Sequence, residues 1–173
     1  MAAARASHGD LERARVLATD PALAERRTAF AEAPHELDGS GAVAMRTAAH
    51  LLGLIDAASE PLAHRHATEV ADLEERIKAY GERGSGKKQL EERHKRELRR
   101  YRTDELRSGL AAMAATYRDT AINPATTNVD ACAEAVRSIH RAIEVLDRNP
   151  NERLLVESLL WSLPDSQGIS PTR

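Results

Sequence analysis

Residues 87–122 read KKQLEERHKRELRRYRTDELRSGLAAMAATYRDTAI, and this stretch decides the fold class. It contains no proline, and its larger residues recur at spacings of three to five, which indicates one very long helix. The residues expected on its inward face are Leu90, His94, Leu98, Tyr101, Leu106, Leu110, Met113 and Tyr117. The first half is highly charged, whereas the second half is rich in Ala and Leu. We therefore predict an antiparallel helical hairpin whose first half protrudes from a core that buries the second half.

Helices are also predicted before this stretch. A break at 81–86 (GERGSG) separates it from a helix that begins at Ser59-Glu60-Pro61 and ends near Tyr80. An earlier helix is expected from about Ser40 to Ala58. Further toward the N-terminus, Asp10 and Asp20 are candidate N-caps, and the helix after Asp20 is expected to end at about Ala33, before Pro34.

Two more helices are predicted after residue 122. The first follows a loop at 123–129 and places Cys132, Val136, Ile139, Ile143 and Leu146 inward. For the second, Asn149 is the expected N-cap, Pro150 the first helical residue and Glu152 part of a capping-box-like arrangement. Pro164 ends this helix.

Composition supports an all-α helical bundle. Only one Phe, one Trp and three Tyr are present among 173 residues, so the core must consist mainly of Leu, Ala, Val and Ile. The formal net charge of -2 gives no whole-chain argument for binding nucleic acid or membranes. We find neither a membrane-spanning run nor a secretory signal, and we expect a cytoplasmic protein.

No combination of residues predicts an enzyme or a metal site. The segment from Gly81 to Lys88 nearly matches a phosphate-binding P-loop, but Lys88 replaces the Ser or Thr that holds magnesium, and a helix replaces the required strand. His64 and His66 lie two residues apart, so on a helix they point in different directions. The lone Cys132 lies in an apolar helical pattern and is interpreted as a buried thiol.

Other candidate reactive groups have ordinary interpretations. Ser7, Ser40 and Ser85 lack the context of a nucleophile, and the acidic pairs Glu74-Glu75 and Glu91-Glu92 are interpreted as solvated carboxylates. We therefore predict no catalytic residue and no cofactor.

A basic run is the strongest local charge signal. Residues 87–102 contain eight Lys or Arg against three Glu. On a protruding helix this excess suits phosphates or an acidic partner, and the candidate phosphate contacts are Lys95, Arg96, Arg99 and Arg100. The alternative is a solvated hairpin with pairs within the helix such as Glu92–Arg96, which the scarcity of aromatic residues for base stacking favours.

Two segments carry a resemblance to a known family. Residues 149–160 (NPNERLLVESLL) resemble the closing helix of the collar domain of bacterial clamp-loader subunits, and residues 5–14 (RASHGDLERA) are similar to the end of the helical lid that precedes the collar. Between them, the hairpin at 87–110 is similar to that of the delta-prime type of DNA polymerase III loader subunit in high-GC Gram-positive bacteria.

The resemblance implies a domain organisation and partners. Residues 1–34 would be the end of an AAA+ lid domain, residues 35–164 a collar that holds the subunit in a ring, and residues 165–173 a disordered tail. The partners would be loader subunits of the gamma/tau and delta types, in a ring that loads the sliding clamp onto DNA during replication. Arg13 lies near the place where ATP-binding relatives have a nucleotide-sensing Arg, but it is not expected to be catalytic.

The last helix is the expected subunit interface. Its apolar residues cover more than one face, as expected of a terminal helix that packs on its own bundle and on a partner, with full burial within the monomer as the alternative. They are Leu154, Leu155, Leu159, Leu160 and Trp161. The sequence thus predicts a non-catalytic assembly domain, and a helical nucleic-acid-binding domain acting through residues 87–102 is the alternative.

Overall fold

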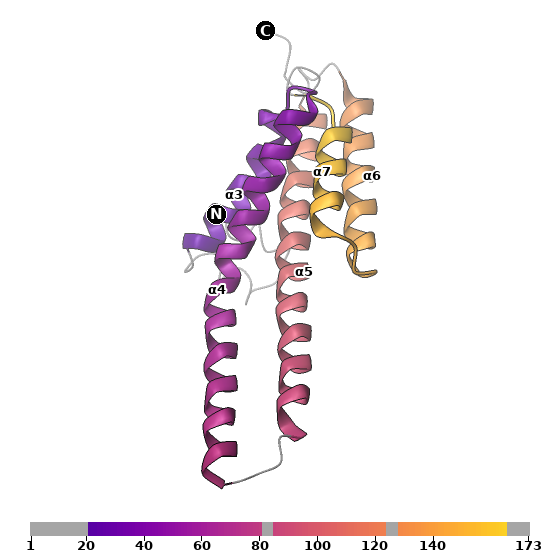
Figure 1. Cartoon of the computed structure of the whole chain (residues 1–173). Helices are drawn as coiled ribbons and strands as arrows, with labels where there is room; N and C mark the ends of the chain where they lie inside the picture. The colour runs from indigo at the N-terminus through magenta and orange to yellow at the C-terminus, as the bar shows by residue number, and fades with distance from the viewer. Residues whose placement is uncertain (1–20, 81–84, 124–127, 166–173) are drawn as a thin grey trace.

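The computed structural model describes residues 21–80, 85–123 and 128–165, and these ranges form five α-helices without a strand (Figure 1). The helices are α3 (Pro21–Glu36), α4 (Gly41–Tyr80), α5 (Ser85–Ala121), α6 (Val129–Leu146) and α7 (Glu152–Ser162). The predicted all-α helical bundle is confirmed. The expectations for Ser7, Asp10, Arg13, the break at 81–84 and the tail beyond Asp165 lie outside the described residues.

The described residues form a helical bundle and a two-helix arm (Figure 1). The bundle contains α3, the first part of α4, the second part of α5, α6 and α7. The arm consists of residues 62–80 of α4 and residues 85–101 of α5, which run antiparallel and extend away from the bundle, as the periodicity of 87–122 predicted.

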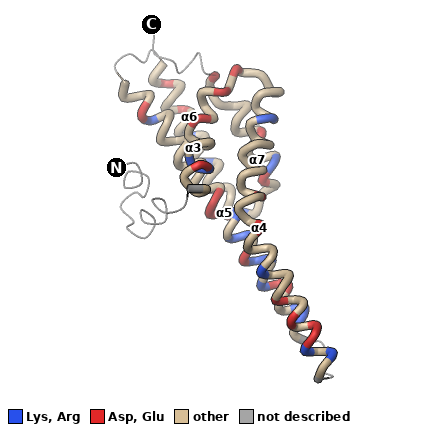
Figure 2. The backbone as a smooth tube through the Cα atoms, turned by 90° about the vertical axis from the view of Figure 1, so that its left-hand side faces the viewer, with Lys and Arg blue, Asp and Glu red and all other residues tan. Residues whose placement is uncertain are grey.

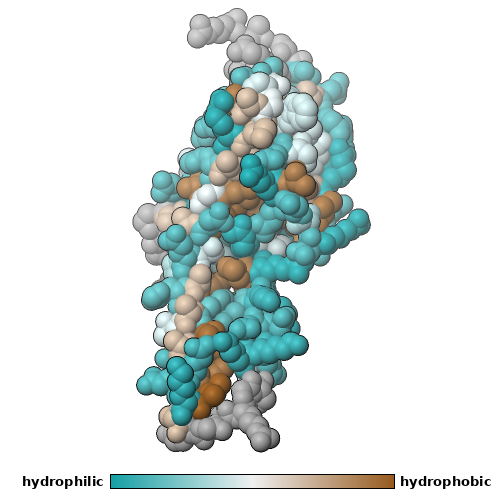
Figure 3. Space-filling view, in the orientation of Figure 1, coloured by the Kyte–Doolittle hydropathy of each residue, from teal (hydrophilic) through white to brown (hydrophobic). Residues whose placement is uncertain are grey.

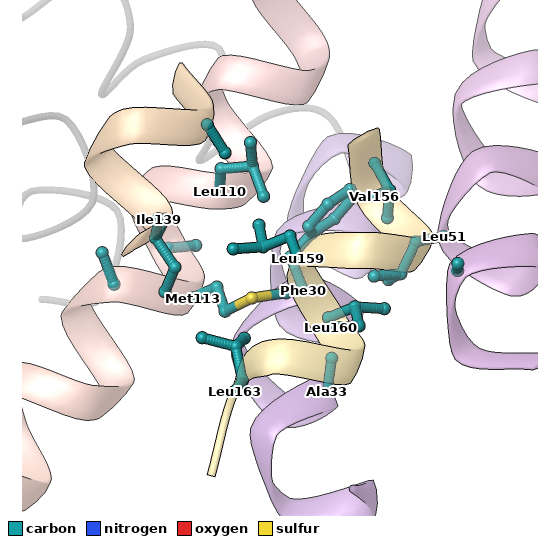
Figure 4. Packing of buried hydrophobic residues seen from close by; sticks show 14 of the residues in the cluster. Phe30, Ala33, Leu51, Leu110, Met113, Ile139, Val156, Leu159, Leu160 and Leu163 are labelled. Atoms are coloured by element: carbon teal, nitrogen blue, oxygen red, sulfur yellow. The ribbon is translucent and has the colours of Figure 1, made fainter. Parts of the chain in front are cut away.

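The core is built around α5, which packs against α3, α4 and α6, while α7 packs against α4 and α6. Figure 4 shows side chains from all five helices meeting there, with Leu110 and Met113 of α5 facing the residues of α3, α6 and α7. The fully buried side chains include Phe30, Leu51, Leu106, Leu110, Met113, Tyr117, Ile139, Val156 and Leu160. The residues predicted to face inward in the second half of α5 are therefore confirmed as core residues.

The helix α3 is an integral part of this core. Phe30 lies directly over Gly109 of α5, where a Cβ atom would come within 2.6 Å of the ring. Thr116 of α5 donates a hydrogen bond to the carbonyl of Ala31 at 2.8 Å. Arg26 forms a half-buried ion pair with Glu105 at 2.9 Å.

The predicted end of α3 before Pro34 is wrong, because α3 continues to Glu36 with Pro34 inside it. The boundary expected at residue 34 therefore falls within a helix. The Pro34 side chain is fully buried. A proline near the C-terminal end of a helix removes only one backbone hydrogen bond, which burial of the ring in the core offsets.

The two helices predicted on either side of residue 59 are one continuous helix. The 40-residue α4 contains Pro61 in its interior, and Figure 1 shows that its direction changes between the bundle and the arm. A proline inside a helix is the usual cause of such a bend. The hydroxyl of Tyr101 donates to the carbonyl of Ala58 at 3.1 Å, and Ser59 donates to the carbonyl of Asp56 at 2.8 Å, so side chains bond the backbone around the proline.

The N-cap of α7 is Asn151 and not Asn149. The Asn151 side chain accepts a hydrogen bond from the N–H of Leu154 at 3.1 Å. Asn149 instead takes a left-handed conformation, with a φ of 56°, in the turn after α6. Asn128 caps α6 in the same way, through the N–H of Ala131 at 3.1 Å.

Candidate interaction surfaces

The first candidate surface is the outward side of α7. Leu154 and Trp161 are 63% and 68% exposed, and they lie seven residues apart, on the same side of the helix. Trp161 lies beside Gly41 at the start of α4, where a Cβ atom would be 3.7 Å from the indole. Met45, one turn further along α4, is also half exposed. We call Leu154 and Trp161 the α7 face.

The other residues of the predicted interface lie elsewhere. Leu159 and Leu160 are buried in the core of the chain itself, and Leu155 is partly buried against it. A helix that packs one side on its own bundle leaves only the opposite side for a partner. Of the five predicted residues, the structure therefore leaves two exposed.

The surface around the α7 face is mixed in character. Figure 3 shows hydrophobic residues in separate patches over the bundle and along the arm, with hydrophilic residues between them. The exposed large hydrophobic residues of the described chain are Met45, Ile122, Val129, Leu154 and Trp161. Ile122 and Val129 flank the undescribed residues 124–127, away from α7 in the sequence.

The second candidate surface is the basic side of α5 in the arm. Lys95, Arg96, Arg99 and Arg100 are all exposed. Lys95 makes a long ion pair with Glu92 at 3.6 Å, and Arg100 another with Asp104 at 3.9 Å. Within the described residues, Arg96 and Arg99 are in no ion pair. These four cations are available to an anionic partner.

Acidic residues reduce the positive charge of the arm. Figure 2 shows Lys and Arg alternating with Asp and Glu along both of its helices. Several basic residues of 87–102 pair across the arm with α4 and not within α5. Lys87 bonds Glu74, and Arg93 bonds Glu69 at 2.6 Å. The predicted pairing of Glu92 with Arg96 is wrong, because Glu92 pairs with Lys95.

Arg102, the last residue of the basic run, joins three helices at the root of the arm. Its guanidinium, on α5, bonds Asp56 of α4 and donates from Nε and Nη2 to Glu152 of α7, at 3.0 and 2.7 Å. Burial lowers the pKa of Arg102, but the bonds to Glu152 and Asp56 outweigh burial and raise it. This cation is neutralised inside the structure, so Arg102 belongs to the fold and not to the basic surface.

A pair of histidines is the most unusual feature of the arm. His66 of α4 and His94 of α5 are only 8% and 7% exposed, and their rings stack with centroids 4.0 Å apart and planes 7° from parallel. His66 bonds Glu97 at 3.0 Å and His94 bonds Glu69 at 2.9 Å. These bonds to histidine are the main reason that the pKa of each glutamate lies below its usual value.

The sequence contains a signal for this pair. Residues 65–69 read RHATE and residues 93–97 read RHKRE, so the pattern Arg-His-x-x-Glu occurs once in each helix of the hairpin. Antiparallel pairing brings the two copies together, because each His meets the Glu of the other copy. The histidine pair was not predicted from the sequence, because His64 and His66 were weighed there only as possible metal ligands.

The structure also places the remaining candidates for chemistry. No cluster of three or more metal-ligating side chains occurs within the described ranges. Cys132 is buried, which raises the pKa of its thiol. Ser40 accepts a hydrogen bond from the N–H of Val43 at 3.2 Å and so caps α4. Ser85 is the first residue of α5.

The acidic pairs are surface groups. Glu74 bonds Lys87 and Glu92 bonds Lys95, while Glu75 and Glu91 are exposed. Among the described helices, none is both long enough and apolar enough to cross a membrane.

Comparison with known proteins identifies no relative. No family model matches the chain, and no curated protein and no solved structure matches it.

Proposed function

We propose that this chain is a non-catalytic assembly domain that binds a neighbouring protein subunit through the α7 face. The observation that carries the proposal is the exposure of Trp161 and Leu154 on the outward side of one helix. Trp is one of the residues most enriched among those that contribute most of the binding free energy of protein interfaces.

The bundle holds the α7 face in place. Val156, Leu159 and Leu160 fix the opposite side of α7 in the core, and Asn151 caps its first turn. Arg102 ties Glu152, the first residue of α7, to α4 and α5. A helix fixed in this way loses little further entropy when a partner binds, which favours affinity.

The resemblance of residues 149–160, 5–14 and 87–110 suggests the assembly. We propose a bacterial DNA polymerase III clamp loader, in which this chain is the collar region of a delta-prime-type subunit in the cytoplasm. Its neighbours would be gamma/tau-type and delta-type subunits, and its role in replication would be to hold the ring together while ATP-binding subunits act.

The first test is size-exclusion chromatography with light scattering, on the chain alone and mixed with collar regions of the other loader subunits. We expect a stoichiometric complex, and the Leu154→Ala/Trp161→Ala variant should bind at least about 30-fold more weakly. Both residues are exposed, so the fold should survive, which circular dichroism verifies. Ile122→Ala, which truncates an equally exposed residue far from α7 in the sequence, is the matched control and should bind normally.

The outcomes separate the two parts of this proposal. Binding that persists in the double variant would refute the α7 face as the interface. Absence of any complex with loader subunits, at low and at moderate salt, would refute the clamp-loader assignment.

A second candidate function is binding of nucleic acid through the arm. It is favoured by the exposure of Lys95, Arg96, Arg99 and Arg100 on one helix. Fluorescence anisotropy with a labelled DNA duplex tests it. Binding should weaken steeply with salt and disappear when the four residues are replaced by Gln. The control replaces Arg137 and Arg141, two exposed cations of α6, and should leave binding unchanged.

A further inference from the structure

The arm buries almost nothing except its two histidines. Within residues 62–79 and 86–101, only His66 and His94 are buried, while the leucines, Val70 and Ile77 are half-buried. An ordinary two-helix hairpin places Leu or Ile at such central positions because apolar burial stabilises it. The arm instead has two titratable rings there, stacked face to face at 4.0 Å.

The hydrogen bonds define the protonation state that the arm accommodates. A carboxylate only accepts hydrogen bonds, so Nε2 of each histidine must carry the proton that it donates to Glu97 or Glu69. A neutral ring satisfies this requirement. A further proton therefore adds to Nδ1, which puts positive charge on the ring while the bond to glutamate remains.

The charged groups around the rings balance when both histidines are neutral. From α4, Arg65 and Glu69 face the pair, and from α5, Arg93 and Glu97 face it. Each arginine already pairs with a glutamate that also binds a histidine. The two Arg and two Glu sum to zero, so the carboxylates are not free to neutralise two extra protons. The neighbouring surface groove adds the acidic Asp72 and the basic Arg76 and Arg96, and so one further positive charge, which opposes protonation of the rings.

We propose that the His66–His94 stack is a proton-controlled latch, which holds the two helices of the arm together until both rings are protonated. When only one ring is protonated, it still lies against a neutral ring and a carboxylate. Two protonated rings place like charges 4.0 Å apart in a cluster whose carboxylates are already paired. The helices then separate, while the bundle, whose core is apolar, stays folded.

Histidine is the side chain whose charge ordinarily changes between about pH 5 and 8, so the test compares these two pH values. The half-buried residues of the arm, such as Leu90 and Leu98, still favour the closed arm, so protonation of both rings raises the fraction of open arms and does not open all of them. This device is independent of the proposed assembly function, because the arm and the α7 face share no residue.

The test measures the separation of the two helices as a function of pH. Spin labels are attached to Ala71→Cys in α4 and Gln89→Cys in α5, two exposed positions that the His66–His94 register places at the same level of the antiparallel arm. The parent chain, whose only cysteine is the buried Cys132, is the labelling control. We expect one narrow distance distribution at pH 8, and at least a tenfold rise in the ratio of open to closed arms at pH 5, roughly the effect of one unfavourable charge contact.

Variants separate the histidine pair from other causes. His66→Leu/His94→Leu replaces both rings by apolar side chains and should keep the narrow distance distribution from pH 8 to pH 5. The single variant His66→Gln should keep it too, because only one chargeable ring remains and two like charges cannot form. His64→Gln removes an exposed histidine of the same helix and should open like the parent. A narrow distribution at pH 5 in the parent, or opening of the double Leu variant like the parent, would overturn the proposal.

Discussion

The bundle and the arm are held together by different forces, although α4 and α5 run through both. Every buried hydrophobic residue of the described chain lies in the bundle, and none lies in the arm. The arm is joined by ion pairs across its helices, such as Arg93–Glu69 and Lys87–Glu74, and by the stacked histidines. One helix is therefore stabilised by apolar burial along half of its length and by charge along the other half.

This difference has consequences for stability. Burial of a large apolar side chain contributes about 1.5–3 kcal/mol, whereas an exposed ion pair contributes little and is screened by salt. The bundle is thus the stable unit of the molecule. The arm is the region whose geometry responds to salt and pH.

The largest expected effect comes from truncating the same residue type in the two regions. Leu110→Ala removes a fully buried side chain from the bundle and should lower the free energy of unfolding by about 3 kcal/mol. Leu98→Ala removes a half-buried side chain from the arm of the same helix and should cost only about 1 kcal/mol. Urea denaturation followed by circular dichroism measures both. Equal losses would contradict the contrast between bundle and arm.

The sequence was sufficient for the parts of the fold that depend on local periodicity. The inward residues of α5, His94 included, were predicted correctly because one helix face recurs every three to four residues. The interpretations of Pro34 and Pro61 as helix ends were wrong, because the rule that ends a helix at a proline considers only the local chain. The core contacts of Pro34 and the bond from Tyr101 to the Ala58 carbonyl are tertiary and offset the local cost.

The site residues divide in the same way. Periodicity showed that α7 is apolar on more than one side, but only packing separates Leu154 and Trp161 from Leu159 and Leu160. In NPN at 149–151, the sequence predicted Asn149 as the cap, but Asn149 takes a left-handed turn and Asn151 is the cap. The histidine pair requires the register between two helices, which a single helical pattern does not contain.

An intermediate effect is expected at the contact between α3 and α5. Gly109→Ala places a methyl group within 2.7 Å of three atoms of the Phe30 ring, so the two helices must move apart. Overpacking of this kind costs about 1–3 kcal/mol, which exceeds the helix propensity that Ala gains over Gly.

Gly53→Ala is the matched control, because a Cβ there meets nothing within 4 Å, on an exposed position of α4. It should stabilise the protein by about 0.5–1 kcal/mol through helix propensity alone. Thermal unfolding of the two variants gives the comparison. Stabilisation by Gly109→Ala would show that α3 does not pack on α5 at this distance.

The smallest effect on stability per residue is expected from protonation of single carboxylates at acid pH. Acid pH should also separate the behaviour of the arm from that of the bundle most clearly. Hydrogen bonds from His94, Lys87 and His66 hold the pKa of Glu69, Glu74 and Glu97, respectively, below the usual range. A carboxyl whose pKa is lower in the folded than in the unfolded state stabilises the fold above its unfolded pKa, about 4.3. That contribution is lost as the pH falls through the lower, folded value.

Acidification from pH 4.5 to 2.5 should therefore separate the arms that are still closed at pH 4.5, before the bundle unfolds. Glu134 of the bundle also has a lowered pKa, but its partners Arg141 and Arg137 lie on the same helix, so its protonation breaks no contact between helices. Distances between labels at residues 71 and 89 follow the arm, and the nuclear magnetic resonance signals of the buried Tyr117 ring follow the bundle. Glu74→Gln should weaken this step by removing one of the three carboxylates. Loss of both signals at the same pH would mean that the arm and the bundle unfold as one cooperative unit, despite the different forces that hold them.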